Sequence, residues 1–128
     1  MSHELRENTR FSVKEAVLVA FFPPDQREYI MLGDLTDISE NGLGVCYTDT
    51  EKQSTESMQV SIFGIENVGF VSRIRCKVVY DINIPGDPLP SPCLRRCGIF
   101  FEEPPANRKD QLKQFMGSLI TLSLRTME

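Results

Sequence analysis

The sequence has few of the features on which enzymes and membrane proteins depend. Its single histidine is His3, in a polar stretch, so no histidine base is at hand for a serine or cysteine nucleophile. It has no P-loop, and the pair Gly42 and Gly44 lacks the third glycine of a dinucleotide fingerprint. No apolar run approaches the roughly 20 residues of a membrane span, and residues 1–8 lack the apolar stretch of a signal peptide. We therefore expect a cytoplasmic protein that is not an enzyme.

Metal-ligand patterns are also missing. The four cysteines are Cys46, Cys76, Cys93 and Cys97. They form no CxxC pair, and the nearest two, Cys93 and Cys97, are separated by three residues. We expect no metal and no cofactor, and we interpret the thiols as small buried hydrophobic side chains. Cys93 is the exception, because its proline-rich surroundings favour exposure.

The sequence also has no excess of positive charge. The net charge is −4 and the isoelectric point about 5.1, whereas general DNA or RNA binding usually needs a strongly basic surface. A small anionic ligand stays open, because two or three arginines suffice to bind it. The length of 128 residues favours a single domain.

From residue 11 onward, short apolar runs alternate with turn residues, as in antiparallel strands. The first four runs are 13–22, 28–37, 42–47 and 58–65. A fifth run, 70–80, alternates with period two. Its predicted inner face carries Phe70, Ser72, Ile74, Cys76, Val78 and Tyr80, and its predicted outer face carries Val71, Arg73, Arg75, Lys77 and Val79. The proline- and glycine-rich stretch 82–92 predicts a loop.

The last strand is expected over 94–102, where Cys97, Ile99 and Phe101 alternate with Gly98 and Phe100. A helix should follow, over about 106–124, with Asn107 as its N-cap. Its apolar residues recur at helical spacing: Leu112, Phe115, Met116, Leu119 and Ile120. The predicted fold is mainly β, a six-stranded antiparallel β-barrel over 11–128 with a C-terminal α-helix. Residues 1–10 are expected to form a flexible N-terminal arm.

Two short motifs carry the functional prediction. Arg6 and Arg10 form an RxxxR motif in the arm, and Asp37, Ser39 and Gly42 form a DxSxxG motif between two predicted strands. Together, in this order and spacing, they resemble the two signature elements of the PilZ domain family. The resemblance runs from about residue 5 to residue 115 and includes the strand pattern and the terminal helix.

The resemblance implies a bacterial second-messenger receptor that binds cyclic di-GMP. Guanidinium groups bind phosphate bidentately and also read or stack on guanine, which suits Arg6 and Arg10. Asp37 can accept from the guanine N1 and N2 donors, and Ser39 can donate or accept nearby. Gly42 permits a positive φ and a close approach of the ligand.

Other functions remain open at this point. A PilZ-like scaffold could bind protein and no nucleotide, and a barrel of similar outline could be an enzyme, such as a flavin-dependent reductase. A receptor with no attached output domain would signal through a downstream protein partner or through self-association as a homodimer. The arm, ordered by the ligand, is the surface we expect a partner to recognise.

Overall fold

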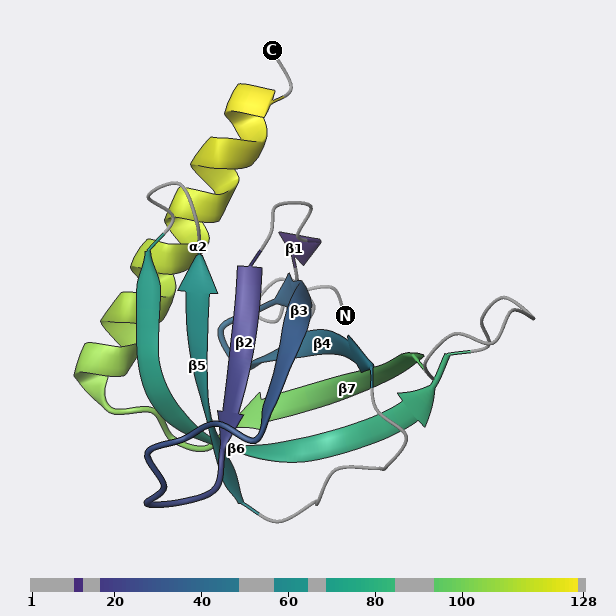
Figure 1. Cartoon of the computed structure of the whole chain (residues 1–128). Coiled ribbons are helices and arrows are strands. Elements are labelled where there is room, and N and C mark those ends of the chain that lie inside the picture. Colours follow the sequence, from purple (N-terminus) through teal and green to yellow (C-terminus); the bar gives the residue numbers. More distant parts are fainter. Residues whose placement is uncertain (1–10, 13–16, 49–56, 65–68, 85–93, 127–128) are drawn as a thin grey trace, which may run out of the picture.

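The computed structural model describes residues 11–12, 17–48, 57–64, 69–84 and 94–126. Six strands close into an antiparallel barrel, and one helix packs on its side (Figure 1). The order of the strands around the barrel is β3-β2-β5-β6-β7-β4, and β4 pairs with β3 to close it. The elements are β1 (Phe11–Ser12), β2 (Val17–Phe22), β3 (Met31–Ile38), β4 (Gly42–Thr48), β5 (Met58–Gly64), β6 (Phe70–Asn83), β7 (Leu94–Phe101) and α2 (Ala106–Thr126). The predicted fold is therefore confirmed.

The two-residue strand β1 is an addition to the barrel. Phe11 pairs with Ile38 and Ser12 with Asp37, whereas the β2 pairing starts lower on β3, at Leu18 opposite Asp34. Strands β1 and β2 thus lie along the same edge of β3. The predicted first strand, 13–22, is observed from residue 17 onward, and residues 13–16 lie outside the described part.

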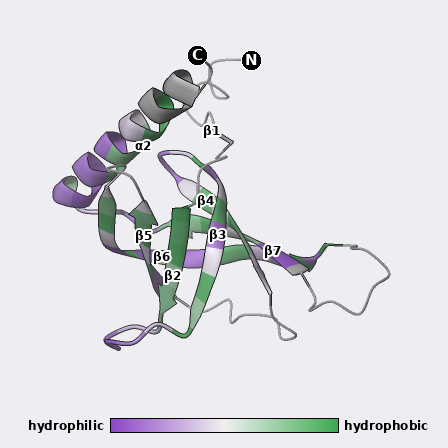
Figure 2. Ribbon diagram, turned by 45° about the horizontal axis from the view of Figure 1, so that its top comes forward, coloured by the Kyte–Doolittle hydropathy of each residue, from purple (hydrophilic) through white to green (hydrophobic). Residues whose placement is uncertain are grey.

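The core consists of aliphatic and aromatic side chains from all six barrel strands and from α2. The largest fully buried side chains include Phe21, Ile38, Ile62, Ile99 and Phe115. Figure 2 shows the apolar residues concentrated on the strands and hydrophilic residues on the first turns of α2. Burial of this apolar surface is the main favourable term in folding.

The predicted inner and outer faces of β6 are wrong near both ends of the strand, because the structure contains two register shifts. One lies opposite β5, between Val60 and Ile62, and the other opposite β7, between Val78 and Tyr80. A shift of one residue turns every later side chain to the other face. Phe70 and Tyr80, predicted to face inward, are therefore exposed, and Val71, predicted to face outward, is buried. Strand β6 also extends to Asn83, so the predicted loop at 82–92 begins too early.

The helix begins at Ala106, as predicted, but its N-cap differs. The carbonyl of Pro105 accepts from Arg108 and Lys109, so Asn107 lies inside the first turn and is not the N-cap. The helix ends at Thr126, two residues beyond the predicted end. Four of the five predicted apolar residues are buried against the barrel: Leu112, Phe115, Met116 and Leu119. The fifth, Ile120, is 39% exposed.

Polar contacts fix the helix against the outside of β6. The Gln111 side chain accepts from the backbone N–H of Ser72 at 2.9 Å, and Arg108 Nε donates to the carbonyl of Arg73 at 3.2 Å. Among the described residues, no helix is both long and apolar enough to cross a bilayer.

Candidate ligand-binding face

The DxSxxG motif spans the tight turn between β3 and β4. The backbone N–H of Ser39 donates to the carbonyl of Gly42 at 2.8 Å, and Ser39 Oγ accepts from the N–H of Asn41 at 3.2 Å. The same hydroxyl donates to the Gly42 carbonyl at 3.4 Å, and Ser39 is only 2% exposed. The hydroxyl predicted to serve a ligand is therefore engaged inside the turn, where it stabilises the turn's shape.

Strand β7 holds this turn from the side. The N–H of Phe101 donates to the carbonyl of Asn41 at 2.8 Å. A Cβ at Gly42 would lie 2.0 Å from the carbonyl oxygen of Ile99. Gly42 is needed for this close approach, and not for the positive φ expected from the sequence: Gly69 is the one glycine with positive φ in the described part of the chain.

Asp37 lies near the end of β3, on the outer side of the barrel. Its Oδ2 accepts a hydrogen bond from Arg96 Nη2 at 3.0 Å, and the side chain is 17% exposed. Its backbone partner is Ser12 of β1, so the chain that leads into the arm passes directly beside it. Arg6 and Arg10 lie outside the described residues.

Asp37 belongs to a row of four residues that crosses four strands. Asp37 pairs with Gly44 of β4, Gly44 with Gly98 of β7, and Gly98 with Tyr80 of β6. A Cβ at Gly44 would lie 2.9 Å from Asp37 Oδ1, and a Cβ at Gly98 would lie 2.1 Å from the Tyr80 ring. The two glycines thus leave room for the carboxylate and the phenol ring on the outer face. We call Asp37, Gly44, Gly98 and Tyr80 the glycine row.

Arg96 is the residue of this face that sequence reasoning missed. It lies on β7 two residues before Gly98, hence on the same side of the strand, and its backbone partners are Cys46 and Ile82. Burial raises the pKa of the Cys46 thiol against the opposing effect of Arg96, so the thiol stays neutral at pH 7. The predicted alternation of β7 places Arg96 outward, but the sequence does not reveal that β4 brings it to Asp37.

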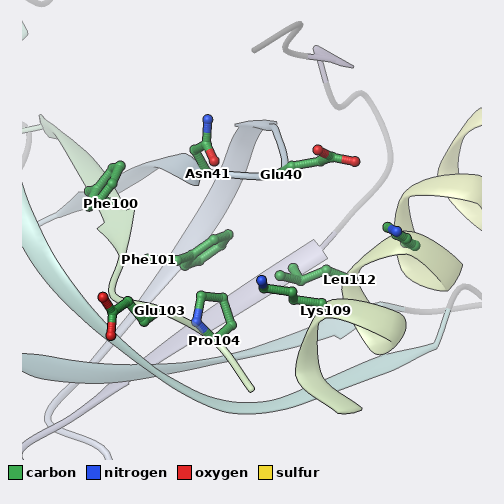
Figure 3. A pocket seen from close by; sticks show the side chains of 9 residues that line it. Glu40, Asn41, Phe100, Phe101, Glu103, Pro104, Lys109 and Leu112 are labelled. Atoms are coloured by element: carbon green, nitrogen blue, oxygen red, sulfur yellow. The ribbon is translucent and has the colours of Figure 1, made fainter. Parts of the chain in front are cut away.

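A cavity of about 810 Å³ opens on the helix side of the turn (Figure 3). Glu40 and Asn41 line it from the turn, and Lys109 and Leu112 line it from α2. Asp37, Ser39 and Gly42 do not line it. Of these three motif residues, Asp37 is the one whose side chain reaches the outer face of the barrel, where it meets Arg96.

The described residues contain no cluster of side chains that could bind a metal ion. No group of three or more histidine, cysteine, aspartate or glutamate side chains is placed there to hold an ion. Cys46, Cys76 and Cys97 are free thiols, while Cys93 lies outside the described residues.

No family model and no curated protein sequence matches this chain. Solved structures do resemble it. The PilZ domain of YcgR from Escherichia coli, solved with cyclic di-GMP, superposes with a TM-score of 0.70 at 14% identity, over 95% of this chain and 96% of that domain. The apo structure of MrkH of K. pneumonia superposes with a TM-score of 0.68 at 16% identity. The structure of MrkH in complex with cyclic di-GMP superposes with a TM-score of 0.69 at 18% identity.

The apo MrkH match covers 91% of this chain and 50% of MrkH, so the chain spans about half the length of that protein. The chain thus corresponds to about half of MrkH and to nearly the whole PilZ domain of YcgR. With the strand order, the terminal helix and the turn described above, these superpositions lead to one conclusion: the chain has the fold of a PilZ domain.

Proposed function

We propose that this chain is a cyclic di-GMP receptor and not an enzyme, and that it acts in the bacterial cytoplasm. The observation that carries the proposal is the position of Asp37. It lies on the outer barrel face beside β1, which connects directly to the arm that bears Arg6 and Arg10. In the proposed site, Asp37 accepts from guanine and the arginines of the adjoining segment bind phosphate.

Chain geometry supports the convergence of the two motifs. Arg10 is bonded to Phe11, and consecutive Cα atoms are about 3.8 Å apart. Phe11 pairs with Ile38, the residue between Asp37 and Ser39, so the covalent bond to Phe11 limits how far Arg10 can lie from the motif turn. Arg6 is five residues from Phe11, a span of at most about 18 Å even when fully extended. Both arginines can therefore reach a ligand on the outer face.

Each motif residue receives a role in this proposal. Arg6 and Arg10 bind phosphate and guanine, and Asp37 accepts from the guanine N1 and N2 donors. Ser39 and Gly42 shape the turn that presents Asp37, because the Ser39 hydroxyl is buried in hydrogen bonds within it. YcgR and MrkH, whose folds are similar, were both solved with cyclic di-GMP.

Isothermal titration tests the proposal. We expect cyclic di-GMP to bind with a dissociation constant in the low micromolar range or below, which corresponds to about −8 kcal/mol. Cyclic di-AMP and GTP should bind much more weakly, and added salt should weaken binding of cyclic di-GMP. The absence of any heat at roughly 100 µM cyclic di-GMP would contradict the proposal and favour a scaffold that binds only protein.

We further propose that the ligand orders residues 1–10 against the barrel and that a protein partner, or a second copy of this chain, recognises the ordered arm. Ordering costs about 1–2 kcal/mol per residue in backbone entropy, so the arginine contacts must offset it. Amide hydrogen exchange across residues 5–11, with and without cyclic di-GMP, is the test. Strong protection in the ligand-free monomer would contradict the switch and indicate a preformed pocket.

The acidic net charge further predicts that the protein does not bind DNA or RNA. MrkH, described as a cyclic di-GMP-dependent transcription regulatory factor, makes this prediction worth a direct test. A gel-shift titration with duplex DNA at low salt, with and without cyclic di-GMP, should show no complex. A salt-sensitive complex would contradict the prediction.

A further inference from the structure

Arg96 has more hydrogen-bonding capacity than Asp37 uses. A guanidinium group carries five N–H donors, and Asp37 Oδ2 accepts one of them, from Nη2. Its Nε is buried and has no partner among the described residues. The side chain as a whole is nevertheless 43% exposed on the outer face. Donors of Arg96 are therefore available to a ligand that lies on this face.

The same contact fixes where these donors lie relative to the carboxylate. Arg96 and Asp37 come from β7 and β3, which are joined through β4, and their side chains meet at 3.0 Å. An acceptor and a donor are thus held side by side at one edge of the glycine row. A carboxylate has about four lone-pair sites, so Asp37 can accept from a ligand in addition to the partners it already has.

This arrangement matches one edge of guanine. Along its Watson–Crick edge guanine presents two donors, N2 and N1, followed by the acceptor O6, whereas adenine presents a donor at N6 and an acceptor at N1. If Asp37 accepts from N2 and N1, the next position along that edge is O6. Arg96 is the neighbouring donor on the protein.

We infer that Arg96 is a specificity-determining ligand residue: it donates to O6 of the guanine whose N1 and N2 donate to Asp37. The pair reads the whole edge and rejects adenine, which would place a donor against Arg96 and an acceptor against Asp37. The glycine row supports the assignment, since the lack of side chains at Gly44 and Gly98 lets the Asp37 carboxylate and the Tyr80 ring lie close over the strands on this face. This inference rests on the proposed function, because it assigns a further residue to the same site.

The test measures binding of three ligands by isothermal titration. They are cyclic di-GMP, cyclic di-AMP and cyclic di-IMP, in which hypoxanthine keeps O6 and N1–H but lacks the 2-amino group. Arg96→Ala should weaken the binding of cyclic di-GMP and of cyclic di-IMP by the same factor, about tenfold or more, because both ligands carry O6. Its effect on cyclic di-AMP should be smaller. Arg96→Lys should recover part of the loss, because it retains a charged donor.

Two controls separate direct contact from indirect effects. Arg75→Ala removes an exposed arginine of neighbouring β6 and should change each dissociation constant less than about twofold. Arg96→Ala introduced into Asp37→Ala should still weaken cyclic di-GMP binding several-fold if Arg96 contacts the base itself. No further loss in that background would show that Arg96 only positions Asp37, and would overturn the inference.

The two proposals fail in different ways. If the unaltered protein does not bind cyclic di-GMP, the proposed function is wrong, and the role of Arg96 with it. If the unaltered protein binds and Arg96→Ala binds equally well while its thermal unfolding is unchanged, only the role of Arg96 is wrong. Equal losses for cyclic di-GMP and cyclic di-AMP would likewise show that Arg96 does not read O6.

Discussion

Arg95 and Arg96 are consecutive on β7, yet their guanidinium groups bind carboxylates on opposite sides of the barrel wall. Arg95 Nε donates to Asp81 Oδ1 at 2.8 Å in the interior, and Arg96 Nη2 donates to Asp37 Oδ2 at 3.0 Å on the outer face. Successive side chains of a strand point to opposite faces, so one segment of backbone serves both ion pairs. The interior pair therefore fixes the strand that carries the outer one.

The interior pair depends on a third residue, which gives a stability prediction. Tyr47 Oη donates to Asp81 Oδ2 at 2.5 Å, and both side chains are buried. Tyr47→Phe removes a donor from a buried carboxylate and should lower the free energy of unfolding by about 2 kcal/mol. Tyr80→Phe is the matched control, because Tyr80 is 42% exposed, and should change it by less than about 0.5 kcal/mol. Urea unfolding measures both; equal effects would contradict the role of Tyr47.

Two buried thiols predict how stability depends on pH. Burial raises the pKa of Cys76 and of Cys97 to about 12, whereas a thiol in an unfolded chain has a pKa of about 8.5. The folded state binds these protons more tightly, so this stabilisation is present in full below about pH 8.5 and is lost as the pH rises toward 12. The slope reaches about 1.4 kcal/mol per pH unit for each thiol.

Urea unfolding under reducing conditions at several values between pH 7 and pH 10.5 measures this slope. Cys97→Ala should lower stability near pH 7 and should make the slope above pH 8.5 shallower by up to one thiol's share. Parallel curves for the variant and the unaltered protein would show that the Cys97 thiol ionises as easily in the folded state as in the unfolded one.

Gly44 offers a variant that disturbs the binding face. A Cβ there would lie 2.8 Å from Thr36 Oγ1 and 2.9 Å from Asp37 Oδ1, so Gly44→Ala must displace the Asp37 side chain. We expect it to weaken binding of cyclic di-GMP by about tenfold or more while the barrel stays folded. Gly117→Ala, in an open position of α2, should leave binding unchanged and stabilise the protein by about 0.5–1 kcal/mol. Unchanged binding in Gly44→Ala would exclude Asp37 from the site.

The arm arginines give the last prediction. Arg10→Ala should weaken binding of cyclic di-GMP by about 2 kcal/mol or more, a factor of about 30, because charge-assisted hydrogen bonds are lost. Arg27→Ala removes an exposed arginine from the loop at the other end of β3 and serves as the control. Titration of both variants at two salt concentrations should show a reduced salt dependence for Arg10→Ala alone. Identical behaviour of the two variants would contradict the assignment of the arm.

Alternation of side chains predicted strand β7 well, because Cys97, Ile99 and Phe101 face the core as expected. It failed at both ends of β6, where register shifts opposite β5 and β7 turned Phe70 and Tyr80 outward. A shift of this kind depends on the partner strand, and a single strand's sequence carries no mark of it.

In the candidate site too, the local features were predictable from the sequence and the contacts between distant strands were not. The DxSxxG motif predicted the position of the turn, because its hydrogen bonds are local in sequence. Arg96 was missed because its contact with Asp37 joins residues 59 positions apart. The closing pairs β4–β7 and β3–β4 create that contact, and neither is recognisable before the order of the strands is known.

The closure of the barrel also has a consequence for folding kinetics. Gly42 pairs with Phe100, so strands β4 and β7 can meet only after a long intervening segment has been brought back. Loop closure of this kind is slow, and proteins dominated by distant pairings fold in milliseconds to seconds. The hydrogen bond from Phe101 to Asn41 and the contact of Arg96 with Asp37 both need this pairing. A refolding chain would therefore gain affinity for its ligand only when β7 has paired with β4, so ligand binding would report the closure of the barrel.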